Sequence, residues 1–533
     1  MPIIDMRTLD GSTTVDSEVC VIGAGAAGLV LAAVLARRGV SVVVLEAGGR
    51  ACANEKDSGM TAIVEPDNYR AACQGRAFGL GGTTSLWGGQ LIPHSELDFR
   101  RTETESFDFW RHLVAVIDRQ SENVCALLGM DPMCEWFNAE DCLSTFVVAA
   151  LHTHGIQALT ADWLPFRRRN LSFLAEPQEA RAELCIYLNA PAGRWNLTTD
   201  ASGLLRVKTV SARAFGKSLT VRARAYVLAA GAIETTRILL EMERSAGRPF
   251  RAGSALGICL GDHLSCPVAG VSKENRTQCK KLFGPQFRNG RMRSFRFVER
   301  EVPADAPRGF FHFIFENEDP GFALVRKVLL GLQSRTLPAV SWQEVGLGVA
   351  GTTALAWERF ARRRLHIPRR TPSHLQLDIE QLPNPANRIT LCDRLDAFGR
   401  PVAAISWSVS VADEEAIRSA AARFLAAWPQ HNSFPRLFPE LGEATAPKPH
   451  DVYHPVGTCR MGTDREAVAD PQLLVHGASN LWCASTSVFP SAGTANPTFS
   501  LFCLANALAE RLAGQAGISS DASDRSVDLH TYA

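Results

Sequence analysis

Residues 18–28 read Glu-Val-Cys-Val-Ile-Gly-Ala-Gly-Ala-Ala-Gly, and this stretch decides the fold. A short apolar run, predicted to be a strand, leads into a Gly-x-Gly-x-x-Gly turn and then into a helical pattern over residues 29–38. A second β-branched run over residues 41–45 ends on Glu46, 18 residues after the last glycine. Strand, glycine turn, helix, strand and acid in this order are typical of a dinucleotide-binding βαβ unit.

Each part of this unit has a mechanical role. Gly23 permits the tight turn, Gly25 lets the backbone approach a pyrophosphate, and Gly28 lets the helix pack closely on the strand. The helix N-terminus offers unpaired N–H groups and its dipole to the phosphates. Glu46 is placed to hold a ribose hydroxyl. Glycine-rich turns without ligands are common, but the full context favours dinucleotide binding.

Composition excludes several classes of protein. The chain has 533 residues, of which 46% are hydrophobic and 21% charged, and this indicates an ordinary globular protein with two or more domains. A net charge of +1 gives no reason to expect nucleic acid as a partner. The 14 cysteines lack Cys-x-x-Cys or zinc spacing, so we expect no metal site and no disulfide framework, as in a reducing compartment.

The chain also lacks the patterns of secretion and membrane insertion. Residues 1–17 are polar and carry three aspartates, unlike a signal peptide. No window of about 20 uncharged apolar residues is present. A cytoplasmic location without membrane contact is therefore expected. Residues 322–370 leave alternatives open, because helical apolar stretches run into an arginine-rich segment at 359–370. An amphipathic surface helix is the simplest interpretation, and a lid, a membrane-surface contact or a partner site are the others.

The remaining patterns divide the chain. A glycine-rich loop occupies residues 79–89, and a buried strand with a small-residue turn at 226–231 resembles a second nucleotide-side element. Alternating runs at 309–315, 375–380 and 388–391 predict an antiparallel sheet within residues 270–450. The last 15 or so residues are polar and expected to be disordered.

Two clusters near the C-terminus could carry chemistry. Residues 453–462 read Tyr-His-Pro-Val-Gly-Thr-Cys-Arg-Met-Gly, and residues 485–498 read Ser-Thr-Ser-Val-Phe-Pro-Ser-Ala-Gly-Thr-Ala-Asn-Pro-Thr. A helical pattern over 499–512 follows directly. Small residues crowded before a helix suit the close approach of a flavin edge or a phosphate. A lone histidine such as His454 is more often structural than catalytic, so spacing alone does not decide its role.

Taken together and in this order, the motifs resemble the glucose-methanol-choline (GMC) family of FAD-dependent alcohol oxidoreductases. The resemblance covers nearly the whole chain and includes Gly261-Asp262-His263. It implies an α/β fold with an antiparallel sheet: a Rossmann-like FAD-binding domain of the glutathione-reductase type, and a substrate domain of antiparallel sheet with flanking helices. The FAD-binding domain would comprise residues 1–105, 181–268 and 452–533. The substrate domain would comprise residues 106–180 and 269–451.

The resemblance also implies site residues. His454 and Asn496 would form the catalytic pair, and Gln90, Gln381 and Tyr453 are weaker candidates for substrate contacts. No metal is implied. Some members attach FAD through a histidine just after the glycine loop, but this chain has Leu86 and Trp87 there, so non-covalent FAD is expected, with His94 as an outside alternative. The residues implied to bind FAD are Gly23, Gly25, Gly28, Glu46, Arg76, Gly81, Gly82, Thr83, Thr84, Trp87, Gly88, Ala192, Ala229, Gly231, Ser487, Val488, Phe489, Asn496 and Thr498.

The implied reaction is oxidation of an alcohol to an aldehyde or ketone. A histidine with a pKa near 6.5 can take the hydroxyl proton while the carbinol hydrogen leaves as hydride for flavin N5, and a neighbouring amide can orient the oxygen. The favoured substrate is a sugar, aminosugar or polyol, and the electron acceptor is oxygen, a quinone or a separate redox protein. Alternatives are a hydroxynitrile lyase, a fatty-acid photodecarboxylase, an FAD-holding sensor, and an NAD dehydrogenase that the first motif alone would fit.

Overall fold

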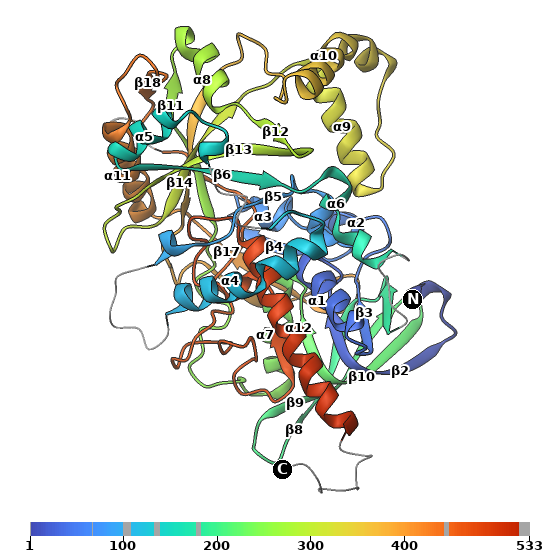
Figure 1. The fold of residues 1–533 in the computed structure, drawn as a ribbon. Coiled ribbons are helices and arrows are strands. Elements are labelled where there is room, and N and C mark those ends of the chain that lie inside the picture. The colour runs from blue at the N-terminus through green and yellow to red at the C-terminus, as the bar shows by residue number, and fades with distance from the viewer. Residues whose placement is uncertain are drawn as a thin grey trace, which may run out of the picture.

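Two large sheets organise the protein (Figure 1). The computed structural model describes residues 2–66, 68–99, 108–132, 139–176, 183–441 and 447–521, with side chains up to residue 515 in the last range. One sheet lies near both termini, and the other forms the opposite end of the molecule. This arrangement confirms the expected α/β fold with an added antiparallel sheet.

The first sheet is the Rossmann-like one. Its strands run parallel from β1 to β10, with β20 parallel to β10, while β9 and β8 extend it in antiparallel pairing. Helices α1 (Ala26–Arg37), α12 (Pro497–Asp521) and α4 (Phe109–Leu128) pack together on it. The strand order is β1 (Ile3–Asp5), β7 (Leu184–Leu188), β3 (Val42–Leu45), β2 (Ser12–Ile22), β10 (Lys217–Leu228), β9 (Leu205–Ala214) and β8 (Ala192–Thr199), with β20 (Leu481–Cys483) beside β10.

The second sheet is antiparallel, as predicted for residues 309–315 and 375–380. A cluster of buried aromatic rings that includes Phe283, Phe311 and Trp428 forms its core. Helices α5 (Thr145–Thr153), α8 (Arg276–Phe283) and α11 (Val411–Ala427) flank it (Figure 1). The strand order is β18 (Leu437–Pro439), β11 (His263–Val271), β15 (Ser373–Glu380), β14 (Gly309–Phe315), β13 (Arg291–Glu299), β6 (Ile156–Trp163) and β5 (Gln90–Leu91); β12 (Gln286–Arg288) pairs with β13, and β19 (His450–Asp451) with β11.

The prediction that residues 388–391 join this antiparallel sheet is wrong. They belong to β16 (Arg388–Leu395), which pairs with β17 (Pro401–Ser406), and β17 pairs in parallel with β4 (Ala62–Glu65) in a separate three-stranded sheet. Alternation shows that a strand has one buried face, but it does not identify the neighbouring strand. Strand β5, although it lies in the N-terminal part of the sequence, pairs with β6 of the second sheet. The domain bounds given above stay a prediction.

The remaining helices include α2 (Glu55–Ser58), α3 (Arg70–Cys73), α6 (Phe166–Arg169) and α7 (Gly231–Ala246). The apolar pattern over 322–370 forms a helical hairpin of α9 (Pro320–Ser334) and α10 (Trp342–Ala361) at one edge of the second sheet (Figure 1). Within the described ranges, no helix combines the length and the apolar character needed to cross a bilayer. The tail beyond residue 521, which the sequence predicts to be disordered, lies outside the described residues.

Candidate active site

A cavity of about 720 Å³ lies between the two sheets. It extends from the glycine turn after β2 to the segment that follows β19. Most of the predicted site residues therefore share one space, although the sequence spreads them from residue 23 to residue 498. Those that line the cavity are Gly23, Gly25, Glu46, Arg76, Gly82, Thr83, Thr84, Trp87, Gly88, Gln90, Ala192, Ala229, Gly231, Tyr453, His454, Asn496 and Thr498.

The glycine turn has the geometry of a dinucleotide cradle. A Cβ on Gly23 would lie 2.6 Å from the Ala229 carbonyl oxygen, and one on Gly28 would lie 1.9 Å from the Gly23 oxygen, so both positions require glycine for close packing. A Cβ on Gly25 would meet no protein atom within 4 Å and would instead enter the cavity. The space beside Gly25 is therefore left for a ligand at the N-terminus of α1.

Glu46 closes this end of the cavity from the C-terminus of β3. Its carboxylate accepts hydrogen bonds from the Ala24 N–H at 2.8 Å and the Gly48 N–H at 2.9 Å. Burial raises the pKa of Glu46 to about 7. The side chain is thus fixed beside the glycine turn, where a ribose hydroxyl of a dinucleotide would lie.

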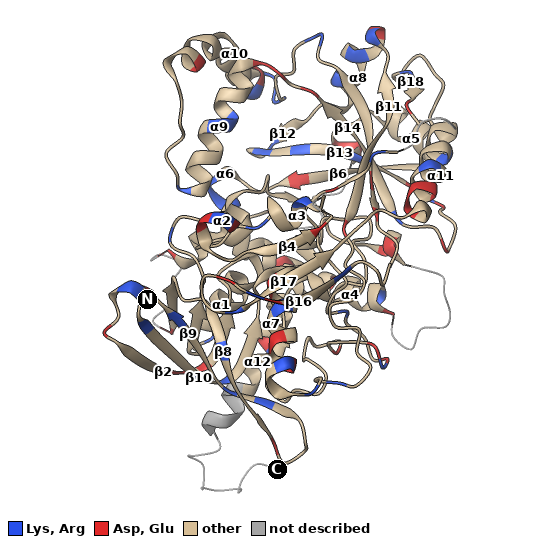
Figure 2. Cartoon of the chain, turned by 180° about the vertical axis from the view of Figure 1, so that it is seen from behind, with Lys and Arg blue, Asp and Glu red and all other residues tan. Residues whose placement is uncertain are grey.

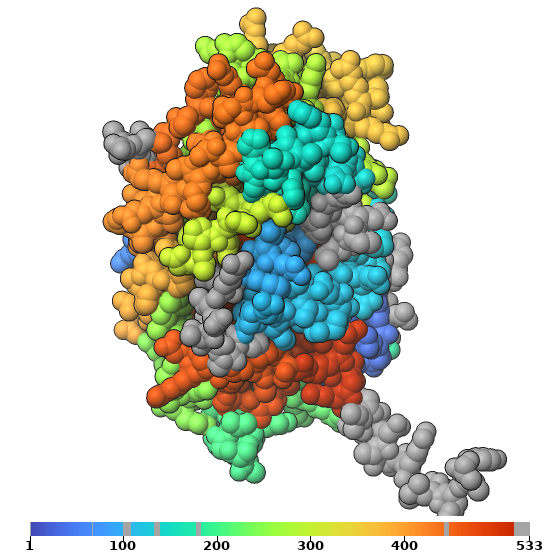
Figure 3. Space-filling view, turned by 60° about the vertical axis from the view of Figure 1, so that its left-hand side comes forward, coloured from blue at the N-terminus to red at the C-terminus, as the bar shows by residue number. Residues whose placement is uncertain are grey.

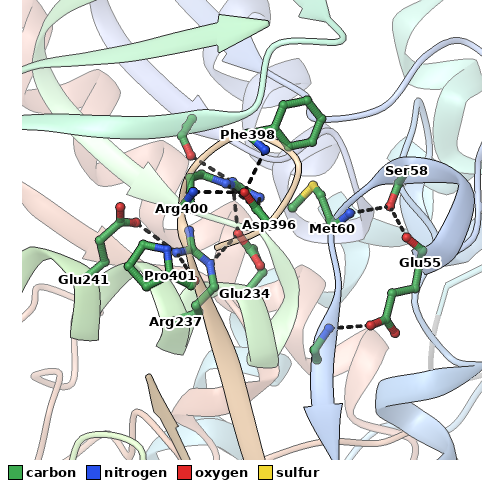
Figure 4. Close-up of polar contacts among 12 residues, drawn as sticks. Glu55, Ser58, Met60, Glu234, Arg237, Glu241, Asp396, Phe398, Arg400 and Pro401 are labelled. Carbon is green, nitrogen blue, oxygen red and sulfur yellow. Dashed lines mark hydrogen bonds and ion pairs between the residues drawn. The ribbon is translucent and has the colours of Figure 1, made fainter. Parts of the chain in front are cut away.

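Arginines gather at the neighbouring wall (Figure 4). Arg237 and Arg400 converge on Glu234, with nitrogen–oxygen distances of 2.9 and 3.3 Å. Arg76 lies 3.4 Å from Glu234, and its Nη1 atom is buried without a hydrogen-bond partner among the described residues. Because Arg76 and Arg400 both line the cavity, this wall fits an anionic diphosphate.

Arg400 was not predicted. It follows a turn at Asp396, whose carboxylate holds the guanidinium at 2.7 Å, and it donates to the Ala192 carbonyl at 3.0 Å. A single arginine after a turn gives no signal in the sequence, because the turn reaches the cavity only through the pairing of β17 with β4.

A pair of histidines lies at the other end of the cavity. His454 Nδ1 lies 2.9 Å from His263 Nδ1, and His263 Nε2 lies 2.8 Å from the Gly493 carbonyl oxygen. A carbonyl can only accept, so His263 carries its proton on Nε2 and its Nδ1 has a free lone pair. That lone pair accepts from the His454 Nδ1–H. His454 Nε2 is consequently unprotonated, in a ring that lines the cavity.

The backbone around His454 is firmly held. The buried Asp262 carboxylate accepts from the His454 N–H at 2.9 and 3.0 Å and from the Tyr69 hydroxyl at 3.0 Å. Tyr453 has a φ of 68°, a left-handed conformation that is uncommon outside glycine and is often found at functional sites. Desolvation, with a smaller contribution from His263, lowers the pKa of His454 to about 3. His454 is therefore neutral at physiological pH.

Polar side chains complete this end, two of them from strands of the second sheet and one, Asn496, from the segment just before α12. Asn496 donates to Gln90 Oε1 at 3.4 Å, and Gln90 donates in turn to Ser294 Oγ at 2.9 Å. Asp378 on β15 also lines the cavity, and the sequence analysis missed it. Burial would raise the pKa of Asp378, but His312 and a hydrogen bond from Ser265 lower it to about 2, so the carboxylate is ionised.

The only sequence signal for Asp378 is its position. It is a charged residue in the alternating run 375–380. Alternation indicates which side chains share one face of the strand, but it does not indicate which part of the protein that face contacts.

Several predicted residues lie elsewhere. Gln381 does not line the cavity: its amide accepts from Trp407 Nε1 and donates to the Ser408 carbonyl, both at 2.8 Å, so the structure does not bring it together with the other predicted residues. His94 is buried, and its two ring nitrogens are bonded to Ser500 Oγ and the Ala492 carbonyl at 2.8 Å. His94 is therefore not placed to attach a cofactor in the cavity.

Five predicted cofactor residues support the walls rather than line them. Gly81 packs against Asn170, where a Cβ would lie 2.1 Å from the amide oxygen, and Gly28 packs against Gly23. Ser487, Val488 and Phe489 are buried behind Ser485 and Thr486, which line the cavity in their place. The motif reaches the site, but the residues that line the cavity, Ser485 and Thr486, precede the predicted ones in the sequence.

These features fit FAD: the glycine cradle, the acidic end of β3 and the arginine wall suit its ADP half, and His454 lines the other end of the same cavity. Two family models agree, one for FAD-dependent oxidoreductases over residues 18–256 and one for GMC oxidoreductases over residues 383–505. Over residues 383–505 the chain is thus similar to GMC oxidoreductases, and over residues 18–256 to FAD-dependent oxidoreductases.

Curated proteins are similar to this chain over segments of different length. A 6'''-hydroxyparomomycin C oxidase of Streptomyces lividus is 24% identical over 91% of this chain and 89% of its own length. An uncharacterised GMC-type oxidoreductase of Mycobacterium tuberculosis is 52% identical over 62 residues, which are 11% of this chain and only 12% of that relative.

Solved structures share the fold. A pyridoxine 4-oxidase of Mesorbium loti has a TM-score of 0.55 at 15% identity and covers 93% of this chain and 99% of its own. A formate oxidase of Aspergillus oryzae has a TM-score of 0.55 at 16% identity and covers 96% of this chain and all of its own.

Proposed function

We propose that this enzyme oxidises a hydroxyl group of a sugar, aminosugar or related polyol to an aldehyde or ketone, with His454 as the base. One observation carries the proposal: His454 is neutral, and its unprotonated Nε2 belongs to a ring that lines the cavity beside Asn496 and Gln90. A binding protein has no need of a base held in this way.

His454 would accept the hydroxyl proton at Nε2. A neutral imidazole can act as a general base, and its effectiveness depends on being held in the correct tautomer. Here His263 sets the tautomer, and Asp262 fixes the backbone that carries the ring. Asn496, held by Gln90, would orient the alcohol oxygen through its amide without competing for the proton.

FAD, when bound, supplies the hydride acceptor. The glycine turn and Glu46 would hold its adenosine half, and Arg76 with Arg400 would neutralise its diphosphate. The attachment would be non-covalent, because His94 uses both ring nitrogens in hydrogen bonds within the core.

The polar groups of the second sheet support a hydrophilic substrate. Asp378 is ionised in the cavity and can accept hydrogen bonds from several hydroxyls or pair with an ammonium group. Gln90 and Asn496 add neutral amides. The long relative named for hydroxyparomomycin C is consistent with an aminosugar. The electron acceptor is proposed to be oxygen, a quinone or a separate redox protein.

The test is to follow flavin absorbance anaerobically while sugars, aminosugars and simple alcohols are added in turn. We expect bleaching by hydroxyl-rich compounds, and an Asp378→Asn variant should need at least ~10-fold more of an aminosugar for half-reduction, the loss of one charge-assisted contact. Bleaching by simple alcohols alone would overturn the substrate class. No bleaching by any compound, with a flavin that dithionite reduces, would favour the lyase or photodecarboxylase alternatives.

A further inference from the structure

The hairpin of α9 and α10 stands apart from the rest of the fold. It projects from one edge of the second sheet (Figure 1), and its residues form a separate yellow mass at the upper edge of the space-filling view (Figure 3). Contacts between the two helices are far more extensive than contacts to any other element. The hairpin is therefore a module whose outer faces are available.

Glycines make the contact between the two helices. A Cβ on Gly351 would lie 2.0 Å from Asp319 Oδ1, and one on Gly321 would lie 2.2 Å from the Thr352 nitrogen. A Cβ on Gly348 would lie 2.8 Å from Leu324 Cδ2. Small residues on the inner faces bring the helices together, and the large apolar side chains of α10 are left on the outside.

The outer face of α10 carries large apolar side chains along most of its length. Trp342 is 90% exposed, Leu347 64%, Trp357 65% and Phe360 80%, and Leu337 in the connecting turn is 98% exposed. Residues 345–357 contain no charged side chain. A surface helix facing water normally carries charges on its outer side. Bulky apolar side chains in this number, concentrated on one element, mark a contact surface.

Basic residues surround this apolar face. Residues 320–370 contain nine lysines and arginines but only two glutamates, whereas the whole chain has a net charge of +1. Arg326 and Lys327 are exposed on α9, and Arg359, Arg362 and Arg363 are exposed at the end of α10. In Figure 2 the basic positions appear as blue bands on α9. The excess of positive charge is thus local to the hairpin.

We propose that the α9–α10 hairpin binds the surface of a membrane that contains anionic lipids, with α10 lying in the plane of the interface. Tryptophan and phenylalanine prefer this interface, and arginines beside them pair with anionic headgroups. The local charge complements lipid phosphates, which distinguishes this occupant from a second copy of this chain, because another hairpin would carry the same positive charge. A membrane-surface contact is one of the alternatives that the apolar and arginine-rich pattern of residues 322–370 leaves open, although no membrane contact is expected from the absence of a spanning segment. This inference does not depend on the proposed function.

Docking there would bring the cavity close to the lipid surface. Gln333 near the end of α9 donates to the carbonyls of Thr84 and Trp87 at 3.0 and 2.8 Å, and its own carbonyl accepts from Asn170 at 2.7 Å. Thr84 and Trp87 both line the cavity. The C-terminal end of α9, next to the turn that leads to α10, therefore rests directly on the loop that borders the active site.

The experiment measures partition of the FAD-loaded enzyme onto phosphatidylcholine vesicles with and without phosphatidylglycerol, by flotation. We expect binding to the anionic vesicles. A Trp342→Ser, Leu347→Ser, Trp357→Ser variant should bind at least ~10-fold more weakly, since each large apolar side chain loses its burial in lipid. A variant with Arg326→Gln, Arg362→Gln and Arg363→Gln should lose about fivefold per charge removed, on anionic vesicles only.

A matched control removes apolar side chains elsewhere. Phe215, Leu395 and Phe438 are 58%, 62% and 54% exposed and lie outside the hairpin, so their change to serine should leave partition unchanged. Flavin content and melting temperature verify that each variant is folded. Absence of vesicle binding by the unaltered enzyme would overturn the proposal. An equal loss of vesicle binding in the control variant would also overturn it. A third contrary result would be a dimer in solution that does not bind vesicles and that the substitutions in the hairpin dissociate.

Discussion

From the contact between His263 and His454 we predict how two substitutions of His263 change the rate of flavin reduction. Because Gly493 forces the proton of His263 onto Nε2, the His263 Nδ1 lone pair is what holds the proton of His454 on its own Nδ1. An asparagine places its amide oxygen near the position of a histidine Nδ1, and a glutamine places its amide near Nε2. His263→Asn should therefore keep the acceptor for His454, whereas His263→Gln should keep the contact to Gly493 and lose that acceptor.

The magnitude follows from the hydrogen bond that is lost. A net hydrogen bond contributes about 0.5–1.5 kcal/mol, and this corresponds to a decrease of about 2- to 13-fold in the ratio of the competent to the other tautomer of His454, which is the largest decrease that the competent fraction can show. We expect the limiting rate of flavin reduction in His263→Gln to fall by this factor, measured anaerobically by stopped flow. The substrate concentration for half-saturation should stay unchanged, because His263 is a positioning residue that acts through His454.

The rate of flavin reduction in His263→Asn should lie within about twofold of the rate in the unaltered enzyme. A change of this size corresponds to less free energy than one weak hydrogen bond contributes. Flavin content and melting temperature should be matched among the variants before rates are compared. The reasoning is refuted if the glutamine variant reacts at the full rate while the asparagine variant is slow. In that case the contact to Gly493, and not the tautomer of His454, would be the important one.

Four further predictions concern the site. His454→Ala should slow flavin reduction by ~10²–10⁴-fold, the usual loss of acid–base catalysis, and an unchanged rate would remove His454 from its role. Folding lowers the pKa of His454 to about 3, so below pH 6.5 the unfolded chain binds a proton at this residue that the folded chain does not. The free energy of unfolding therefore falls as the pH is lowered through this range. Between pH 7 and pH 5, urea unfolding should show a decrease in this free energy that is about 2 kcal/mol larger for the unaltered enzyme than for His454→Gln. Gly25→Val should fold normally but hold FAD at least ~10-fold more weakly, the equivalent of about 1.4 kcal/mol, and full FAD content after dialysis would contradict the cradle. Gly28→Ala should instead yield little folded protein, as judged by circular dichroism, because its Cβ would lie 1.9 Å from a backbone oxygen.

The nucleotide-binding half of the fold could be predicted from local sequence patterns. The apolar run before Gly23, the helix after it and the strand that ends on Glu46 all formed as predicted, because a βαβ unit is specified by residues that are close in sequence. The same is true of the strand and helix around Gly231. His454 and Asn496 needed the family resemblance, since nothing in their own spacing brings them into one cavity.

The parts that were missed depend on contacts between distant segments. Asp378, Arg400 and His263 reach the site or its supporting contacts through strand pairings that alternation cannot assign. Gln381 lies outside the cavity, and the position of a strand end does not reveal that Trp407 would bond to its amide. The register of sheets and the partners of side chains come from tertiary packing, and a single sequence carries them only weakly.

The central claim is that His454 removes a hydroxyl proton while the carbinol hydrogen leaves as hydride. The most direct measurement is anaerobic flavin reduction by an aminosugar or sugar alcohol deuterated at the reacting carbon, with the unaltered enzyme and with His454→Ala. We predict slower reduction by the deuterated substrate in the unaltered enzyme, and reduction ~10²–10⁴-fold slower again in the variant. Equal rates for the two isotopes and for the two proteins would contradict alcohol oxidation at this site.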